Sequence, residues 1–233
     1  MTERRVAMIT GATGGLGRVL APELAADGWD LAMVASSAER LGDLREDLGL
    51  PPERVEPFVA DLRQRQDAAA VVDAAYDRFG RVDALAHLVG GWTGGTNVAK
   101  SPDDSYREMI DQHFWTSLNV VRELAPRMVD VGFGRIAAVT SPMAAAPDAG
   151  MSAYGVGKAA QETLFAALAQ EVAGTGVTVN VVRVRAIDTS AGEAGSEKDY
   201  ATSPAEISAA LRYLFSDAAR VVNGQRIGLH SGI

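Results

Sequence analysis

The sequence contains no cysteine, which excludes disulfide bonds, thiolate metal sites and catalysis by a cysteine nucleophile. Long apolar runs are also missing. The first run, at residues 6–9, ends before Gly11 and is too short for a signal-peptide core or a membrane span, so we expect a first β-strand there. Lysine is scarce, and Lys100, Lys158 and Lys198 are the three lysines among 22 basic side chains. Because arginine serves wherever a bare positive charge suffices, each lysine is a candidate for a more particular role.

Positive charge is also in the minority. The chain carries 30 acidic and 22 basic residues, a formal net charge of -8. This balance argues against general nucleic-acid binding and against adsorption to an anionic membrane surface.

His87 and His230 have no partner at a spacing typical of metal ligands, so we expect no metal site.

The composition nevertheless supports one sizeable core, because 47% of the 233 residues are apolar. No internal repeat, low-complexity tract or linker divides the chain. We therefore expect a single domain over residues 1–233. We also expect a cytoplasmic protein, with which the lack of cysteine is compatible.

Short apolar runs alternate with segments of helical spacing. Strands are predicted at residues 6–10, 31–35, 55–59, 84–89, 135–140, 177–184 and 226–230, and helices at 15–27, 37–48, 63–79, 103–131, 151–174 and 203–216. This alternation predicts βαβ units, and uninterrupted apolar runs are typical of strands covered on both faces. The predicted fold class is α/β: a single-domain, Rossmann-type, doubly wound sheet of seven parallel strands, with a ligand at their carboxyl ends.

A glycine-rich turn, TGATGGLG at residues 10–17, joins the first predicted strand to the first predicted helix. Glycine permits a sharp turn and a close approach of the backbone to a pyrophosphate. The helix N-terminus adds free N–H groups and the positive end of its dipole. A tight turn that binds nothing is the alternative, but this position in a βαβ pattern favours nucleotide binding.

The ribose 2′ position of a dinucleotide is normally recognised about 20 residues further on. Here Ser36 and Ser37 follow the second predicted strand, so no carboxylate repels a 2′-phosphate, and Arg40 offers a positive charge from the next helix. We therefore predict that NADPH is favoured over NADH. Asp61, after the third predicted strand, either accepts a hydrogen bond from the adenine amino group or caps the next helix.

Tyr154 and Lys158 lie four residues apart in a predicted helix, so their side chains share one face. A neighbouring ammonium stabilises a phenolate and lowers the pKa of the tyrosine. Such a tyrosine suits acid catalysis of carbonyl reduction, or base catalysis of alcohol oxidation. Ser141 ends the fifth predicted strand, where its hydroxyl is placed to hold the substrate oxygen. The order of these three residues along the fold indicates an active site.

Together these motifs resemble the short-chain dehydrogenase/reductase family over nearly the whole chain. The resemblance implies that Tyr154 is the proton donor, that Lys158 holds the nicotinamide ribose, and that Ser141 orients the carbonyl. It also implies a homotetramer, or otherwise a homodimer, built on the helices at 103–131 and 151–174. The cofactor-binding residues that we predict are Gly11, Thr13, Gly15, Leu16, Gly17, Ser36, Ser37, Asp61, Leu62, Val89, Gly90, Tyr154, Lys158, Ile187 and Thr189.

Four positions depart from the family pattern. HLVG at 87–90 replaces Asn-Asn-Ala-Gly, Val-Arg at 184–185 replaces Pro-Gly, and Pro142 follows the predicted catalytic serine. His113 stands where the family has a catalytic asparagine that holds a water behind the lysine. His113 is therefore either a catalytic residue of the proton relay or a packing residue on a buried helix face.

The middle of the chain is similar to dihydropteridine reductase and its bacterial relatives. The similarity lies in VGGWTGG at 89–95, WTS at 115–117 and IDT at 187–189. It implies a compact substrate pocket beside the 189–203 loop, bordered by Gly91, Trp92, Met143 and Met151. Trp92 either stacks on a flat substrate ring or fills a gap beneath that loop.

We predict an NAD(P)-dependent oxidoreductase that reduces a ketone or aldehyde with NADPH, with Tyr154 as proton donor. Its partner is a small-molecule substrate, with no nucleic acid and no membrane. One alternative is a reductase of a quinonoid dihydropterin or another C=N substrate, in which Tyr154 protonates nitrogen. The other is a non-catalytic nucleotide sensor of the same fold. The histidine at 113 favours the sensor, whereas retention of Ser141, Tyr154 and Lys158 favours an enzyme.

Overall fold

The computed structural model describes residues 4–188 and 201–229. Thr189, His230 and residues 189–200 of the predicted loop therefore lie outside the described residues. None of the helices in the described ranges has the length and apolar character that crossing a membrane requires.

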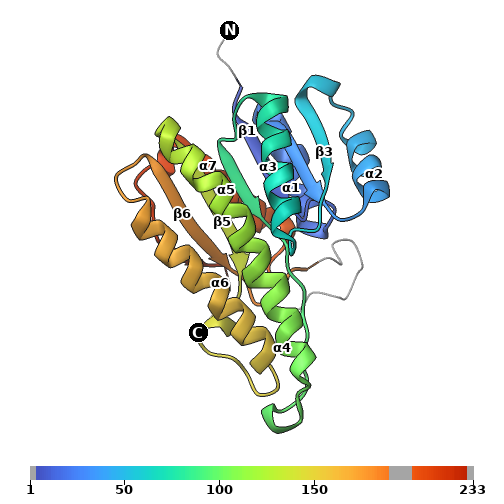
Figure 1. Cartoon of the computed structure of the whole chain (residues 1–233), viewed down its shortest axis with the longest axis vertical. Helices are drawn as coiled ribbons and strands as arrows, with labels where there is room; N and C mark the ends of the chain where they lie inside the picture. Colours follow the sequence, from blue (N-terminus) through green and yellow to red (C-terminus); the bar gives the residue numbers. More distant parts are fainter. Residues whose placement is uncertain (1–3, 189–200, 230–233) are drawn as a thin grey trace.

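Seven strands of the described chain form one sheet in the order β3-β2-β1-β4-β5-β6-β7, and every neighbouring pair is parallel (Figure 1). Their bounds are β1 Val6–Thr10, β2 Asp30–Ala35, β3 Val55–Val59, β4 Ala84–His87, β5 Gly134–Thr140, β6 Val177–Arg183 and β7 Arg226–Gly228. The chain order reverses between β1 and β4, which is where doubly wound sheets bind their ligands. The predicted seven-stranded parallel sheet is confirmed.

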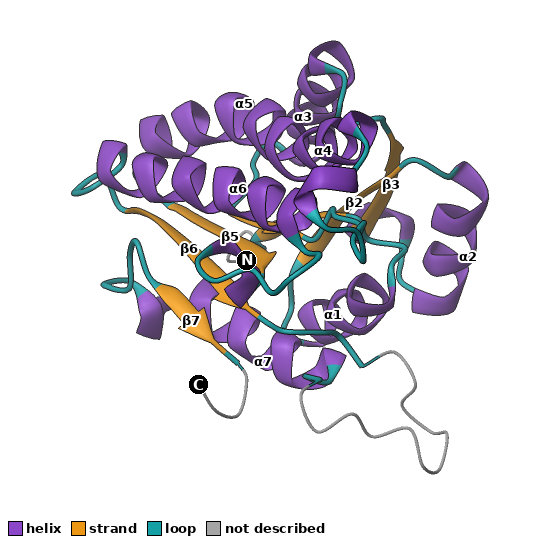
Figure 2. Ribbon diagram, turned by 90° about the horizontal axis from the view of Figure 1, so that it is seen from below, coloured by secondary structure: helices purple, strands orange, loops and turns teal. Residues whose placement is uncertain are grey.

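Helices cover both faces of the sheet (Figure 2). The helices are α1 Gly15–Ala26, α2 Ala38–Leu48, α3 Arg65–Phe79, α4 Asp103–Ile110, α5 Thr116–Val131, α6 Ser152–Glu171 and α7 Pro204–Phe215. Helices α3, α5 and α6 pack on one face, while α1, α2 and α7 pack on the other. Successive strand residues alternate between these layers, because Met8 joins the first apolar cluster and Ile9 joins the second. Burial on both faces explains why inner strands such as β1 and β2 are apolar almost throughout.

The predicted helix at 103–131 differs from the structure, because a π-helical turn at Asp111–Trp115 separates α4 from α5. Two hydroxyls follow this turn and donate to carbonyl oxygens four residues earlier. Thr116 Oγ1 lies 2.6 Å from the Gln112 oxygen, and Ser117 Oγ lies 2.6 Å from the His113 oxygen. A single π turn inside an α-helix is frequent at functional sites. Here it holds His113, which is completely buried.

Strands β4 and β7 also end before their predicted last residues. Strand β4 ends at His87 rather than at residue 89, because the chain leaves the sheet and passes over Gly11 of the glycine-rich turn. Strand β7 ends at Gly228, although the Leu229 N–H still donates to the Arg183 oxygen. The departure after β4 matters for the site, because it brings residues 88–90 beside the glycine-rich turn.

Candidate active site

Two adjoining cavities open at the carboxyl ends of the strands, with volumes of about 420 Å³ and 810 Å³. They share five lining residues at the switch point: Gly11, Gly14, Leu88, Val89 and Gly90. The smaller cavity reaches past the end of β2 to Arg40 and Arg63. The larger one reaches Tyr154 and Lys158 on α6. One elongated cleft therefore joins a charged end to a reactive end.

The glycine-rich turn needs glycine at two positions. Gly11 has a φ of +72°, and a Cβ there would lie 3.0 Å from the Leu88 carbonyl carbon. A Cβ on Gly17 would lie 2.3 Å from the Ala12 oxygen, so α1 packs directly on the turn. No side chain caps the N-terminus of α1 at Gly14. These residues fit a pyrophosphate, because unshielded backbone and an uncapped helix N-terminus face the cleft.

The charged end of the cleft places three predicted cofactor residues together, Ser36, Asp61 and Leu62, with Arg40 beside them. Ser37 is not part of this lining. Its hydroxyl caps α2 and accepts a hydrogen bond from the Arg40 N–H at 3.3 Å. The two neighbouring serines therefore have different roles: Ser36 lines the cleft, whereas Ser37 caps the N-terminus of α2.

Asp61 has a partner that sequence reasoning missed. Arg63 donates to its carboxylate through Nε at 2.8 Å and Nη2 at 2.7 Å, and these hydrogen bonds hold the pKa of Asp61 below its usual value. Asp61 does not cap α3, whose N-cap is Gln64. A spacing of two residues in a loop carries no helical or strand periodicity, so this pair was not predictable from the pattern.

Most of the other predicted cofactor residues also line the cleft. Thr13 and Leu62 lie at the charged end, whereas Gly15, Leu16, Gly17 and Ile187 lie at the reactive end; Gly11, Val89 and Gly90 lie between them. The predicted Thr189 is outside the described residues.

At the reactive end, Tyr154 and Lys158 lie one turn apart on α6, with Lys158 Nζ 6.0 Å from the centre of the tyrosine ring. Ser141 follows β5 and is completely buried. Burial raises the pKa of Tyr154, while a hydrogen bond with Ser141 acts in the opposite direction. The predicted group of Ser141, Tyr154 and Lys158 is thus brought together by β5 and α6.

Lys158 is buried, with 5% of its surface exposed. Its ammonium donates to the Val139 oxygen at 3.0 Å and to Gln161 Oε1 at 3.1 Å. Burial lowers the pKa of Lys158 from 10.5 to about 7, although the negative charge of Glu162 acts to raise it. Burial therefore makes the Lys158 ammonium easier to deprotonate than that of an exposed lysine.

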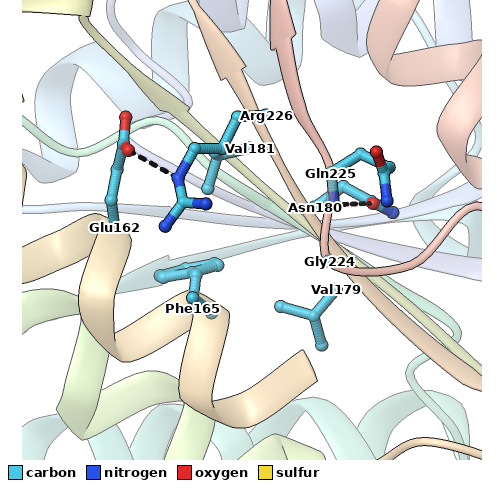
Figure 3. Close-up of a pocket in the computed structure, with 9 residues that line it drawn as sticks. Glu162, Phe165, Val179, Asn180, Val181, Gly224, Gln225 and Arg226 are labelled. Atoms are coloured by element: carbon cyan, nitrogen blue, oxygen red, sulfur yellow. Dashed lines mark hydrogen bonds and ion pairs between the residues drawn. The ribbon is translucent and has the colours of Figure 1, made fainter. Parts of the chain in front are cut away.

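Glu162 is a buried carboxylate beside this group, one turn beyond Lys158 on α6 (Figure 3). It accepts hydrogen bonds from Arg183 Nε at 2.8 Å and Nη2 at 2.5 Å, from Arg226 Nε at 2.9 Å and from Thr140 Oγ1 at 3.1 Å. It therefore ties α6 to β5, β6 and β7. Gln161 and Glu162 were not predicted, although their spacing of three and four residues from Lys158 indicates the same helix face.

His113 lies against the predicted catalytic residues. Its ring meets the Tyr154 ring edge-on, with 5.5 Å between centroids, and its Nε2 lies 3.0 Å from the Gly91 oxygen. Because a carbonyl only accepts, Nε2 carries the proton and Nδ1 is an acceptor; Nδ1 is buried with no partner among the described residues. Burial, and next the charge of Lys158, lower the pKa of His113 to about 3. The imidazole is therefore neutral at working pH.

His87, the other histidine that departs from the family pattern, acts in the fold. Its Nδ1 lies 2.9 Å from Thr10 Oγ1 and its Nε2 lies 3.4 Å from Thr116 Oγ1, so it links β1, β4 and α5. Burial, followed by the charge of Lys158, lowers the pKa of His87 to about 3.

The predicted substrate pocket is brought together in part. Gly91 and Trp92 line the larger cavity, and Trp92 is 61% exposed among the described residues. Met143 and Met151 are not in its lining. Met143 Sδ accepts a hydrogen bond from the Asp148 N–H, and Met151 Sδ packs against Gly94. Both sulfur atoms therefore contact loop backbone near the opening of the larger cavity.

Comparisons with known proteins agree with this geometry. A family model described as short chain dehydrogenase matches residues 5–199. The chain is 26% identical over 242 aligned positions to the 3-oxoacyl-[acyl-carrier-protein] reductase of Thermotoga maritima, covering 99% of this chain and 98% of that protein. It is 27% identical over 246 positions to the acetoacetyl-CoA reductase of an Acinetobacter species, covering 100% and 99%. The crystal structure of levodione reductase matches with a TM-score of 0.89 at 24% identity, covering 98% of this chain and 96% of that one.

A doubly wound parallel sheet with a glycine-lined cleft at its switch point defines a dinucleotide-binding class of protein. Within that class, the chain belongs to the short-chain dehydrogenase/reductase family, and it is an NAD(P)-dependent oxidoreductase. The predicted family is confirmed. The more particular likeness to dihydropteridine reductase is not shown by these comparisons.

Proposed function

We propose that this enzyme reduces a ketone or aldehyde with NADPH, in the cytoplasm, with Tyr154 as the proton donor. The observation that carries the proposal is the meeting of Tyr154 and Lys158 with the glycine-rich turn in one cleft. Two of the relatives are named as reductases of 3-oxoacyl-[acyl-carrier-protein] and acetoacetyl-CoA, which supports a ketone ahead of an aldehyde.

A reduced nicotinamide held at the reactive end of the cleft, where Lys158 and Ile187 line the cavity, would supply a hydride to the carbonyl carbon. Tyr154 donates its phenolic proton to the carbonyl oxygen, and the product is an alcohol. The Ser141 hydroxyl, hydrogen-bonded with Tyr154, orients that oxygen. The Lys158 ammonium stabilises the phenolate that remains, so the protonated lysine is the active form. Neutral His113 packs on the Tyr154 ring and offers Nδ1 as an acceptor for the proton relay.

The preference for NADPH rests on charge at the far end of the cleft. Arg40 and Arg63 line that end, and Ser36 follows β2 where a carboxylate would repel a 2′-phosphate. Asp61 is the acidic residue in the described lining, and Arg63 offsets its charge. With the charges of Arg63 and Asp61 offsetting each other, Arg40 leaves a net positive charge at this end, which favours a dianionic phosphate over a hydroxyl.

We propose a homotetramer, or otherwise a homodimer, formed through α5 and α6. A groove of about 450 Å³ runs between these helices on the outer surface. Its lining is mostly apolar, with Val121, Ala125, Val129, Leu164 and Ala167 among its residues. A second copy of the same helix pair would cover this apolar surface, as closed two-fold interfaces do.

The test compares NADPH and NADH with a panel of ketones, aldehydes and quinonoid dihydropterin, monitored by absorbance of the reduced nicotinamide. We expect turnover of a carbonyl compound with NADPH. Tyr154→Phe keeps the ring and should lower turnover by about 10²–10⁴-fold with little change in NADPH affinity. Tyr213→Phe, a half-exposed tyrosine on α7, is the matched control and should keep full activity. Turnover of the pterin alone would favour C=N reduction, and NADPH binding without any turnover would favour a sensor.

A further inference from the structure

A buried chain of hydrogen bonds runs from Lys158 to the π-helical turn. Lys158 Nζ donates to Gln161 Oε1 at 3.1 Å, and Gln161 Nε2 donates to Ser117 Oγ at 3.0 Å. Ser117 Oγ then donates to the His113 oxygen at 2.6 Å. Gln161 and Ser117 are both completely buried. Two polar side chains that are shielded from solvent therefore link Lys158 to the backbone of the π-helical turn.

The direction of each hydrogen bond in this chain is determined by chemistry. An ammonium only donates, so the amide oxygen of Gln161 must face Lys158. The amide nitrogen then faces Ser117, whose own hydrogen goes to the backbone carbonyl of His113. Without the Ser117 hydroxyl, the Gln161 amide nitrogen would lose its acceptor in this chain, and the Lys158 ammonium alone would hold the orientation of the amide. Ser117 therefore acts on Lys158 through Gln161.

We propose that Gln161 and Ser117 are positioning residues that keep the Lys158 ammonium protonated and aimed into the cleft. This inference deepens the proposed function and rests on it. The Val139 oxygen and Gln161 Oε1 hold two of the three N–H groups of Lys158, which leaves the third for the cleft. An ammonium buried to this degree needs such acceptors, because burial favours the neutral amine.

The other charged and titratable groups around Lys158 do not provide this contact. Glu162 and Tyr154 share its helix, but Glu162 is engaged by arginine side chains and Tyr154 is neutral, its pKa raised by burial. His113 from the π-helical turn and His87 from β4 are both neutral, with pKa values of about 3. Strand β5 contributes the Val139 carbonyl. Gln161 is thus the side chain that holds the ammonium directly.

Substitutions at Gln161 should move the pKa of Lys158 in opposite directions. Gln161→Leu removes an acceptor and should lower the pKa by about one to two units, the effect of losing one hydrogen bond to a charged group. Gln161→Glu places a carboxylate there and should raise it by about one unit or more. Ser117→Ala should lower the pKa by a smaller amount, and Ser117→Thr, which keeps the hydroxyl, should restore it. If Gln161 served only in packing, the two Gln161 substitutions would not be expected to shift the pKa of Lys158 in opposite directions.

The pKa is measured on the whole cofactor-free protein by NMR, using lysine labelled with ¹³C at Cε and titrated from pH 5 to 10. The scarcity of lysine makes this practical, because Lys100→Arg and Lys198→Arg assign the signals by elimination. Thermal unfolding checks that each variant is folded. This measurement needs no substrate, so it decides the positioning role even if the proposed reaction fails.

The second measurement is the pH profile of kcat/KM with a carbonyl substrate. Since protonated Lys158 is the active form, activity is present below its pKa and is lost as the pH rises through it. The descending limb should move to lower pH in Gln161→Leu and to higher pH in Gln161→Glu. Lysine pKa values that shift in the same direction in both variants, or that stay within about 0.3 unit of the unmodified protein in all four, would overturn the inference.

Discussion

Replacing His113 by asparagine should make the fold less sensitive to acid. In the folded protein, burial and then Lys158 lower the pKa of His113 from 6.5 to about 3. In the unfolded chain the same imidazole takes up a proton below about pH 6.5. The neutral histidine therefore contributes stability that is fully present above pH 6.5 and is lost as the pH falls towards 3. Asparagine does not titrate, so the variant lacks this loss.

The magnitude follows from the two pKa values. Between pH 6.5 and 3, one histidine that protonates only in the unfolded chain lowers the free energy of unfolding by about 1.36 kcal/mol per pH unit. From pH 6.5 to 4.5 the loss is about 2.7 kcal/mol, on the same basis. His87 is present in both proteins, so its contribution cancels in the difference between their unfolding free energies. Lys158, with a pKa of about 7 in the fold, is largely charged in both states below that pH and adds little slope.

The assay is urea unfolding of the cofactor-free protein at half-unit steps from pH 7.5 to 4.5 and constant ionic strength. The difference in unfolding free energy between the two proteins should change with pH in favour of His113→Asn as acid is added. Phe114→Leu is the control, because it alters the neighbouring position without removing a titratable group and should shift stability equally at every pH. If the unfolding free energies of the unmodified protein and of His113→Asn change with pH in parallel, His113 is not a buried histidine that stays neutral in the fold.

Three further predictions concern the cofactor and the assembly. Lys158→Met should weaken NADPH binding, measured by fluorescence titration, and should also lower turnover, because we propose that this side chain holds the ribose as well as stabilising the phenolate; unchanged affinity would contradict the proposed ribose contact. NADPH should bind about tenfold more tightly than NADH, or about 1.4 kcal/mol, by calorimetry, and Ser36→Asp should reverse the order through repulsion of the 2′-phosphate. Light scattering at micromolar concentration should give an oligomer that Ala167→Arg, in the apolar groove, dissociates; a monomeric mass for the unmodified chain would contradict the proposed interface.

Periodicity by itself determined the layers of the fold and much of the site. A run such as residues 31–35 is apolar because a doubly wound sheet buries both strand faces, so its length marks the strand directly. Tyr154 and Lys158 were predictable as neighbours because four residues on a helix always place two side chains on one face. Local rules of this kind need no knowledge of the rest of the chain.

What only the tertiary structure decided depends on contacts between distant segments. The π-helical turn around His113 arises inside a segment of ordinary helical spacing, and Gln161 meets Ser117 across 44 residues of chain. Ser36 faces the cleft while Ser37 caps α2, a difference that depends on the angle at which the chain leaves β2. A buried polar group needs a hydrogen-bond partner, and the fold decides which residue is close enough to provide it. The periodicity of the sequence does not reveal which residue that is.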